Sequence, residues 1–214
     1  MIPNKVTVID YGLGNLHSVR RGLEKSGAVV NVTSNHKEIL KSKKIVLPGV
    51  GAFENAMKSL KELGLVDIIH EANQKHIPIL GICLGMQLLF DRSEEFGVSE
   101  GLGLISGNVM PLPNVTSSGE KLKIPHIGWN RLLPSDNVDW KDTLMKNIKI
   151  GEAVYFVHSF MAIPSNSDCR VAECIYGDHK ISSVVSNRNI TGCQFHPEKS
   201  GKVGLKILRE FCVD

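Results

Sequence analysis

The first hundred residues alternate between short β-branched apolar runs and stretches with the spacing of amphipathic helices. The apolar runs occupy residues 5–10, 29–33, 43–49 and 77–83, and the helical stretches occupy 14–27, 51–64 and 84–93. In the first helical stretch, Leu16, Val19, Arg20 and Leu23 recur on one side, and Gly27 follows where a helix would end. Strands that alternate with helices in this way predict βαβ units around a mostly parallel sheet, and therefore an α/β fold.

The pattern changes near residue 101. Shorter apolar runs, separated by Gly, Pro and Asn, cover residues 101–113, 123–134, 153–164, 169–177 and 181–197. They predict antiparallel or mixed strands beside the parallel sheet, followed by a closing helix over 201–214. The polar segment 112–121 is predicted to be a loop. Because no linker or repeat interrupts the chain, we expect a single domain, residues 1–214.

Composition excludes several classes of protein. The 214 residues are 42% apolar and 22% charged, as in a globular protein with one sizeable core. A net charge of +3, scattered along the chain, does not predict binding to nucleic acid or to an anionic membrane. The N-terminus lacks a signal-peptide pattern and no apolar stretch approaches the ~20 residues that cross a bilayer, so we expect a cytoplasmic protein. Five irregularly spaced cysteines predict neither a disulfide framework nor a zinc site.

One cysteine has an unusual setting. Cys83 stands between Gly81 and Gly85 in GICLGMQLLF, residues 81–90. A cysteine of a cytosolic protein is more often a buried, inert residue. The G-x-C-x-G pattern between a strand and a helix, however, is the thiol counterpart of the G-x-S-x-G nucleophile elbow, where glycines permit a sharp turn and the start of the helix favours the thiolate. Cys83 is therefore the candidate nucleophile, and the other four cysteines are expected to pack in the interior.

A cysteine nucleophile needs a base and a group that orients this base. The segment QFHPEKS, residues 194–200, provides both. Pro197 favours an extended backbone at His196, so that His196 and Glu198 project to the same side of the chain. The carboxylate can then hold one ring nitrogen while the other faces the sulfur. A histidine at a strand end is by itself more often structural, and only the combination with the elbow predicts a Cys-His-Glu triad.

The segment LPGVGAF, residues 47–53, is the candidate oxyanion hole, which needs backbone N–H groups in a loop that permits close approach. Gly49 and Gly51 flank Val50 and free the chain to turn its amides toward the nucleophile, with the N–H of Leu84 as a second donor. A plain turn between a strand and a helix is an equally good interpretation of this loop taken alone. The loop does not complete the G-x-G-x-x-G pattern, so no dinucleotide site is predicted.

These pieces, in this order, resemble the class I (triad) glutamine amidotransferases. The motifs GICLGMQ and QFHPEKS are widely shared in that family. Together with DYGLGN, LPGVGAF, KIPHIGWN and YFVHSF, they resemble more narrowly the glutaminase subunits of imidazole glycerol phosphate synthases. The resemblance runs from residue 10 to residue 200. It implies a flavodoxin-like, mostly parallel central sheet flanked by helices, with an added antiparallel or mixed portion in the second half.

The resemblance also implies an activity and a role for each residue. Cys83 would attack the side-chain amide of L-glutamine and release ammonia, leaving a glutamyl thioester that water hydrolyses to glutamate. His196 would act as base and then as acid, and Glu198 would orient it. The remaining positions implied are those of the oxyanion hole (Val50, Gly51 and Leu84) and those that hold the glutamine (Gly49, Gly51 and Gln87). No metal or organic cofactor is implied.

A glutaminase of this kind uses the whole chain, so the ammonia acceptor must bind to another polypeptide. The resemblance implies a heterodimer with a cyclase subunit, a (β/α)8 barrel, and a sealed passage between them, because ammonia in neutral water is mostly protonated. The positions implied at this interface and its ammonia gate are Asn15, Lys123, Pro125, His126, Gly128, Trp129, Asn130, Tyr155 and Lys199. Core packing is an equally good interpretation of Trp129 and Tyr155, and His126 and His158 are more often structural than ligands.

Two departures from the family pattern leave the acceptor open. The connection 110–123 is longer than in many members, and Phe160 stands where tyrosine is common. The alternative is a paralogous glutaminase that feeds ammonia to a related synthase in another pathway, for example the amidination of a surface sugar. A cysteine hydrolase or peptidase of similar fold would not need the GMQ or GWN segments, and a subunit that only binds a partner would not need the intact triad.

Overall fold

The computed structural model describes residues 4–136 and 138–213. Residues 1–3, 137 and 214, which belong to the predicted domain 1–214, lie outside the described residues. The strands are β1 (Lys5–Ile9), β2 (Val29–Thr33), β3 (Ile45–Leu47), β4 (Ile79–Ile82), β5 (Phe90–Ser93), β6 (Ser99–Glu100), β7 (Ile105–Pro111), β8 (His126–Arg131), β9 (Leu133–Pro134), β10 (Ala153–His158), β11 (Phe160–Pro164), β12 (Arg170–Tyr176), β13 (His179–Asn187) and β14 (Ile190–Cys193). The helices are α1 (Leu16–Lys25), α2 (His36–Leu40), α3 (Phe53–Glu62), α4 (Leu65–Gln74), α5 (Leu84–Leu88) and α6 (Gly201–Cys212), with short 3₁₀ turns at Ser167–Cys169 and Pro197–Lys199.

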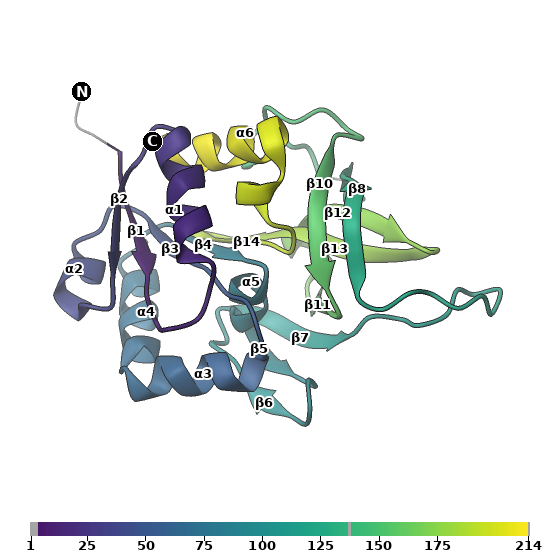
Figure 1. Ribbon diagram of the computed structural model, residues 1–214, viewed down its shortest axis with the longest axis horizontal. Helices are drawn as coiled ribbons and strands as arrows, with labels where there is room; N and C mark the ends of the chain where they lie inside the picture. The colour runs from purple at the N-terminus through teal and green to yellow at the C-terminus, as the bar shows by residue number, and fades with distance from the viewer. Residues whose placement is uncertain (1–3, 137, 214) are drawn as a thin grey trace.

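An eight-stranded sheet in the order β2-β1-β3-β4-β14-β13-β12-β9 forms the centre of the molecule (Figure 1). The strands from β2 to β14 run parallel to one another, and β13, β12 and β9 continue the sheet in antiparallel fashion. Strands β4 and β14 are neighbours, and Ile82 at the end of β4 pairs with Cys193 at the end of β14. The predicted α/β fold, with a mixed sheet in the second half, is confirmed.

Helices cover both faces of the parallel strands. Figure 1 shows α1 and α6 on one face and α3 and α4 on the other. Each face has its own apolar core, one containing Leu23 of α1 and Leu208 of α6, the other Leu60 of α3 and Ile69 of α4. All four residues of β4 are buried, as expected of a parallel strand between two helical layers. The central strands are therefore held by apolar packing on both faces of the sheet.

The segment 84–93 differs from the predicted single helix. Only α5 is helical, and the chain continues directly as β5, which joins β7, β6 and β11 in a four-stranded sheet. Phe90 is fully buried and lies opposite Ile105 of β7. Every residue of α5 is buried as well, so the run carries no exposed polar face, and periodicity alone cannot separate helix from strand in such a run.

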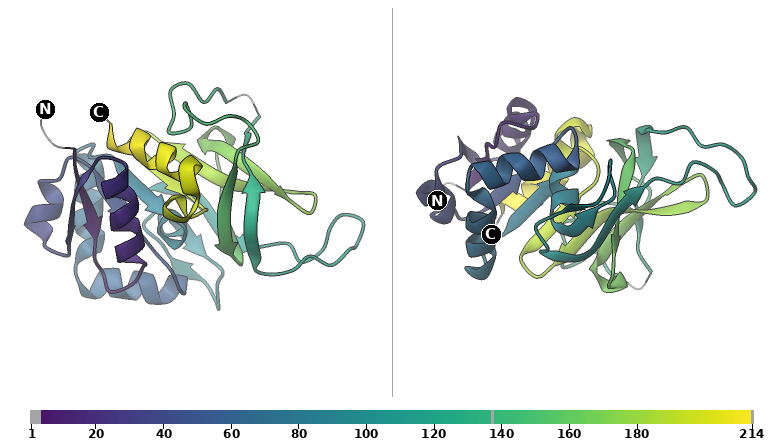
Figure 2. Two further views of the ribbon diagram at one scale, coloured as in Figure 1. Left: turned by 45° about the horizontal axis from the view of Figure 1, so that its top comes forward. Right: turned by 90° about the horizontal axis from the view of Figure 1, so that it is seen from below.

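Strands β8 and β10 form a separate two-stranded antiparallel ribbon. Both views of Figure 2 place this ribbon and the connection before it toward the end of the molecule away from the two termini. The connection contains the predicted loop 112–121, whose two ends approach each other through a bridge between Val115 and Lys121. The loop prediction is confirmed, and so is the closing helix, which is α6.

Candidate active site

Cys83 follows the last residue of β4 and precedes α5. Its φ of 55° and ψ of −111° lie in a backbone region that L-residues rarely adopt, at a cost on the order of 1–3 kcal/mol. The flanking glycines are required by close packing: a Cβ on Gly85 would lie 1.9 Å from the Leu47 carbonyl oxygen, and one on Gly81 would lie 2.6 Å from the Gly85 carbonyl oxygen. The strained elbow predicted from the G-x-C-x-G pattern is therefore present.

A cavity of about 360 Å³ opens at Cys83. Its walls come from the loop after β3, the elbow, the corner between β10 and β11, and the segment after β14. The lining residues are Val50, Gly51, Cys83, Leu84, Gln87, Glu95, Val157, His158, Ser159, Phe160 and His196. The volume lies in the range of pockets that hold small molecules.

His196 enters this cavity from the segment after β14, the neighbour of β4. Its Nδ1 lies 2.8 Å from Oε1 of Glu198, and the two side chains are only 3% and 1% exposed. Nε2 of His196 is also buried and has no hydrogen-bond partner among the described residues. Burial alone would lower the pKa of His196, but the neighbouring Cys83 and Glu198 raise it to about 10. The ring therefore holds a proton at neutral pH, with one nitrogen on the carboxylate and the other available to the sulfur.

The thiol of Cys83 has polar neighbours on other elements as well. Its Sγ lies 3.9 Å from the Val157 carbonyl oxygen and 3.9 Å from Nε2 of Gln194. Tyr11 lies under the adjacent loop and donates a hydrogen bond to the Pro48 carbonyl oxygen at 2.7 Å. Burial, together with the charge of Cys83, raises the pKa of Tyr11. Tyr11 is therefore a protonated support for this loop.

The candidate oxyanion loop is in place at the cavity. Val50 is 40% exposed, Gly51 has a φ of +103°, and both line the cavity together with Leu84. Gly49 is buried and is not among the lining residues. The structure thus brings Val50, Gly51 and Leu84 to Cys83, while Gly49 lies behind them.

Gln87, predicted to hold the substrate, lies in the wall of the cavity at 6% exposure. Its Nε2 donates to the Phe160 carbonyl oxygen at 3.1 Å and to Oε1 of Gln194 at 3.0 Å. Sequence reasoning missed Gln194, which is fully buried. The signal was available in QFHPEKS, because Gln194 stands two residues before His196 and so projects to the same side of an extended chain.

Sequence reasoning also missed Glu95, which lines the cavity after β5. Its Oε2 accepts a hydrogen bond from the backbone N–H of Phe53, the first residue of α3, at 2.6 Å. The segment was predicted to be helix up to residue 93, and no pattern in the sequence indicated that the chain returns to the cavity here.

The predicted partner-binding residues lie largely on the β8–β10 ribbon. Trp129 is 58% exposed, so that core packing is wrong for this residue, and its ring centroid lies 6.2 Å from that of Tyr155. Tyr155 is half-buried, opposite Trp129 in the ladder. The other positions that are half-buried or exposed are Asn15, Lys123, Pro125, Gly128, Asn130 and Lys199.

His126 is the exception. It is only 4% exposed, and its ring stacks on Phe156 and on Tyr176 at centroid distances of 4.9 and 4.2 Å. Alternation along β8 explains this position, because successive side chains point to opposite faces and Ile127 and Trp129 occupy the exposed one. His126 is therefore not exposed on the surface of the chain, and its place at the interface or the ammonia gate stays a prediction.

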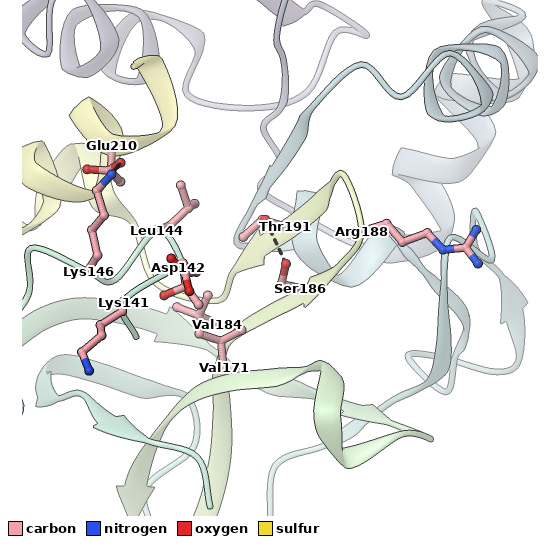
Figure 3. A pocket seen from close by; sticks show the side chains of 11 residues that line it. Lys141, Asp142, Leu144, Lys146, Val171, Val184, Ser186, Arg188, Thr191 and Glu210 are labelled. Carbon is pink, nitrogen blue, oxygen red and sulfur yellow. Dashed lines mark hydrogen bonds and ion pairs between the residues drawn. The ribbon is translucent and has the colours of Figure 1, made fainter. Parts of the chain in front are cut away.

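A second cavity, of about 380 Å³, lies away from Cys83 between β12, β13, β14 and α6 (Figure 3). Figure 3 shows Lys141 and Arg188 at opposite sides of it, with their charged ends directed outward. Lys146 is paired with Glu210 at 2.5 Å, and Ser186 and Thr191 lie 3.4 Å apart. Its lining includes neither cysteine nor histidine. The candidate nucleophile and base both lie at the other cavity, at Cys83.

Two further observations limit the kinds of site in this chain. Across residues 4–136 and 138–213, no group of three His, Cys, Asp or Glu side chains is arranged to hold a metal ion. Within the same residues, no helix combines the length and the apolar character needed to span a bilayer. All five cysteines are free.

Comparison with known proteins agrees with this geometry. The profile of the family described as "Glutamine amidotransferase class-I" matches residues 7–214. The chain belongs to this family. It is therefore a glutamine amidotransferase, an enzyme that hydrolyses glutamine, and the resemblance to this family, the expected fold class and the expected enzyme class are confirmed.

Relatives of known name are similar over almost the whole chain. Imidazole glycerol phosphate synthase subunit HisH 1 of Legionella pneumophila (strain Lens) is 49% identical over 209 residues, which cover 97% of this chain and 98% of the relative. Subunit HisH of Geobacter sulfurreducens is 43% identical, with 97% of each chain covered. The glutamine amidotransferase thus has relatives without large insertions or missing segments.

Solved structures show the same fold at low sequence identity. A crystal structure titled as a glutamine amidotransferase superposes with a TM-score of 0.71 at 15% identity, covering 97% of this chain and 99% of that one. PurLQS from Thermotoga maritima gives a TM-score of 0.71 at 22% identity, covering 99% and 98%.

Proposed function

We propose that this glutamine amidotransferase is the glutaminase subunit of an imidazole glycerol phosphate synthase. It hydrolyses L-glutamine to glutamate and ammonia, and a separate (β/α)8 cyclase subunit uses the ammonia in histidine biosynthesis. The observation that carries this function is the 43–49% identity to HisH subunits over 97% of the chain. We place the protein in the cytoplasm, where its five free cysteines remain reduced.

The site supports amide hydrolysis through a thioester. With the proton held on His196, the sulfur of Cys83 attacks the amide carbon of the substrate, and negative charge develops on the carbonyl oxygen. His196 gives its proton to the nitrogen as the C–N bond breaks, which releases ammonia and leaves the thioester. His196 then takes a proton from the attacking water, the C–S bond breaks, and glutamate leaves. Glu198 holds Nδ1 of the ring throughout, at 2.8 Å.

The developing oxyanion needs donors next to Cys83. Leu84 is the first residue of α5 and can offer its N–H, and Val50 and Gly51 line the same cavity. Their loop is exposed at Val50 and supported from below by Tyr11. We assign the oxyanion hole to Val50, Gly51 and Leu84, and the holding of the substrate to Gln87.

The ammonia acceptor belongs to another polypeptide. Trp129 and Tyr155 present an aromatic pair on the ribbon, and a large exposed aromatic residue is a typical centre of a protein interface. We propose that this face docks on the cyclase subunit. His126 supports the face from behind.

The test is glutamate release from glutamine by the purified chain, alone and with the cyclase subunit of the histidine pathway carrying its nucleotide ligand. We expect strong activation in the complex and loss of activity in Cys83→Ala, whereas Cys169→Ala, at a partly exposed cysteine, keeps it. Ammonium salts should restore synthase activity to the complex of Cys83→Ala. No activation by this cyclase, but activation by another barrel synthase, would assign the chain to a different pathway.

A further inference from the structure

A chain of hydrogen bonds runs from the nucleophile to the docking ribbon. At its inner end, Nε2 of Gln194 lies 3.9 Å from Sγ of Cys83. Oε1 of the same amide accepts from Nε2 of Gln87 at 3.0 Å. Gln87 uses its second amide hydrogen for the Phe160 carbonyl oxygen at 3.1 Å. A single buried amide thus touches both the sulfur and the residue proposed to hold the substrate.

The chain continues through two buried histidines. Nδ1 of His158 lies 2.8 Å from the same Phe160 carbonyl oxygen, and its Nε2 lies 3.0 Å from Nδ1 of His126. Nε2 of His126 lies 3.4 Å from Nδ2 of Asn130, which also donates to the Ile175 carbonyl oxygen at 2.8 Å. Asn130 lies on β8, next to the exposed Trp129.

The acceptor at one end of the histidine pair and the donor at the other fix the proton on each ring. A carbonyl oxygen can only accept, so Nδ1 of His158 must donate to Phe160. Nε2 of His158 is then an acceptor, which requires Nδ1 of His126 to carry a hydrogen and leaves its Nε2 to accept from Asn130. Burial lowers the pKa of both histidines to about 4, so both are neutral at pH 7. The bonds from Asn130 through His126 and His158 therefore all donate in the direction of the Phe160 carbonyl oxygen.

We propose that Gln194 is a positioning residue for Cys83 and Gln87, and that the chain of His158 and His126 holds this arrangement from strand β8. The amide of Gln194 donates to the sulfur, which holds the sulfur in front of His196 and stabilises negative charge on it. The two histidines hold the Phe160 carbonyl oxygen in the position at which it accepts a hydrogen bond from Gln87. Of the experiments that follow, only the measurement of kcat depends on the proposed glutaminase function.

The first experiment measures alkylation of Cys83 by iodoacetamide against pH in the full chain. The charged and titratable groups that face the thiol are His196, Tyr11, His158 and Glu95. In Gln194→Met the donor disappears without a new charge, and we expect alkylation at pH 7 to slow by about tenfold and its midpoint to move to higher pH. An unchanged profile in folded Gln194→Met would overturn the role of Gln194.

Gln194→Glu is the matched variant, since it keeps the shape of the side chain. Its ionised carboxylate can still accept from Gln87 but cannot donate to the sulfur, so the alkylation midpoint should move in the same direction and further. Gln74→Met, at an exposed glutamine of α4, is the control and should leave the profile unchanged. Since alkylation needs no glutamine, this result stands or falls independently of the proposed substrate.

The second experiment needs no variant. Histidine ¹⁵N chemical shifts of the folded chain at pH 7 distinguish a ring with hydrogen on Nδ1 from one with hydrogen on Nε2. We expect His126 and His158 both to carry it on Nδ1. Hydrogen on Nε2 of either ring would break the chain and overturn its direction.

A third measurement tests whether the histidines position the site. His126→Phe keeps an aromatic ring between Phe156 and Tyr176 but removes the donor to His158. We expect kcat for glutamine to fall about threefold or more, while the Phe160 carbonyl oxygen keeps the hydrogen of His158 on Nδ1. His126→Asn, which can still donate at the position of Nδ1, should restore most of the loss. If His126→Phe leaves kcat unchanged, the histidine pair only packs.

Discussion

His126 and His158 lie directly opposite each other on β8 and β10, and their ring nitrogens are 3.0 Å apart in the interior. Neither has a carboxylate partner among its hydrogen bonds. Burial is the main cause that lowers the pKa of each from 6.5 to about 4, and for His158 the neighbouring His126 and His196 add to it. This pair makes the fold sensitive to acid.

We predict that the free energy of unfolding falls as the pH drops from 6.5 to 4. In this interval the unfolded chain binds protons at both histidines and the folded chain does not, so acid favours unfolding. The contribution is complete above pH 6.5 and amounts at most to about 3 kcal/mol for each histidine. His196 adds no slope here, because its raised pKa of about 10 matters only between 6.5 and 10.

Urea unfolding at several pH values measures this slope. His126→Phe should flatten it by about half, because one of the two groups is removed. His17→Phe, at an exposed histidine of α1, is the control and should keep the full slope. Equal slopes in all three proteins would contradict the role of the buried pair.

Glu198→Gln should lower kcat for glutamine by about 10²- to 10⁴-fold while the chain stays folded. The amide has the same shape but cannot stabilise the protonated ring of His196, and it can present an N–H to Nδ1 and so impose the wrong tautomer. The measurement is steady-state glutamate release in the complex, with Glu62→Gln on the exposed end of α3 as control. Activity within tenfold of the unaltered enzyme would argue against an orienting role.

Trp129→Ala should weaken the complex with the cyclase subunit by about 2 kcal/mol or more, or about 30-fold in Kd. Because Trp129 is 58% exposed, the stability of the isolated chain should change by less than about 1 kcal/mol. Phe96→Ala is the matched control, since Phe96 is an aromatic residue 86% exposed outside the ribbon. Titration calorimetry gives Kd. Equal affinities of both variants for the cyclase subunit would show that the docking face does not lie on the ribbon.

Gly85→Ala should destabilise the chain by about 3 kcal/mol or more. The new Cβ would meet the backbone oxygen of Leu47 at 1.9 Å, and neither strand β3 nor the elbow can move without disturbing the sheet. Gly119→Ala, where the Cβ meets nothing within 4 Å and only a φ of +86° is strained, should cost about 1 kcal/mol. Thermal unfolding measures the stability of both variants. Equal losses of stability would contradict close packing at the elbow.

The sequence was sufficient for features that depend on local pattern. Alternation of strands and helices predicts the parallel sheet, G-x-C-x-G predicts the elbow, and the period of two in H-P-E predicts the contact between His196 and Glu198. These signals work because the residues concerned lie close together in the chain or repeat with a period that the backbone imposes.

Features that depend on long-range packing were not predictable. Strand β5 follows α5 without a break, because Phe90 finds its partner in Ile105 and no local residue marks the change. Burial of His126 depends on Phe156 and Tyr176, which arrive from β10 and β12. Gln194 acquires its contacts from Cys83 and Gln87, both distant in sequence.

The pairing of β4 with β14 has a consequence for how the protein is made. Cys83 leaves the ribosome before β14, which begins at Ile190, and before His196, which follows β14. The neighbour that completes the catalytic pair is therefore synthesised long after the thiol. A nascent or prematurely terminated chain carries the thiol without its base, and cannot waste glutamine before the whole sheet has closed.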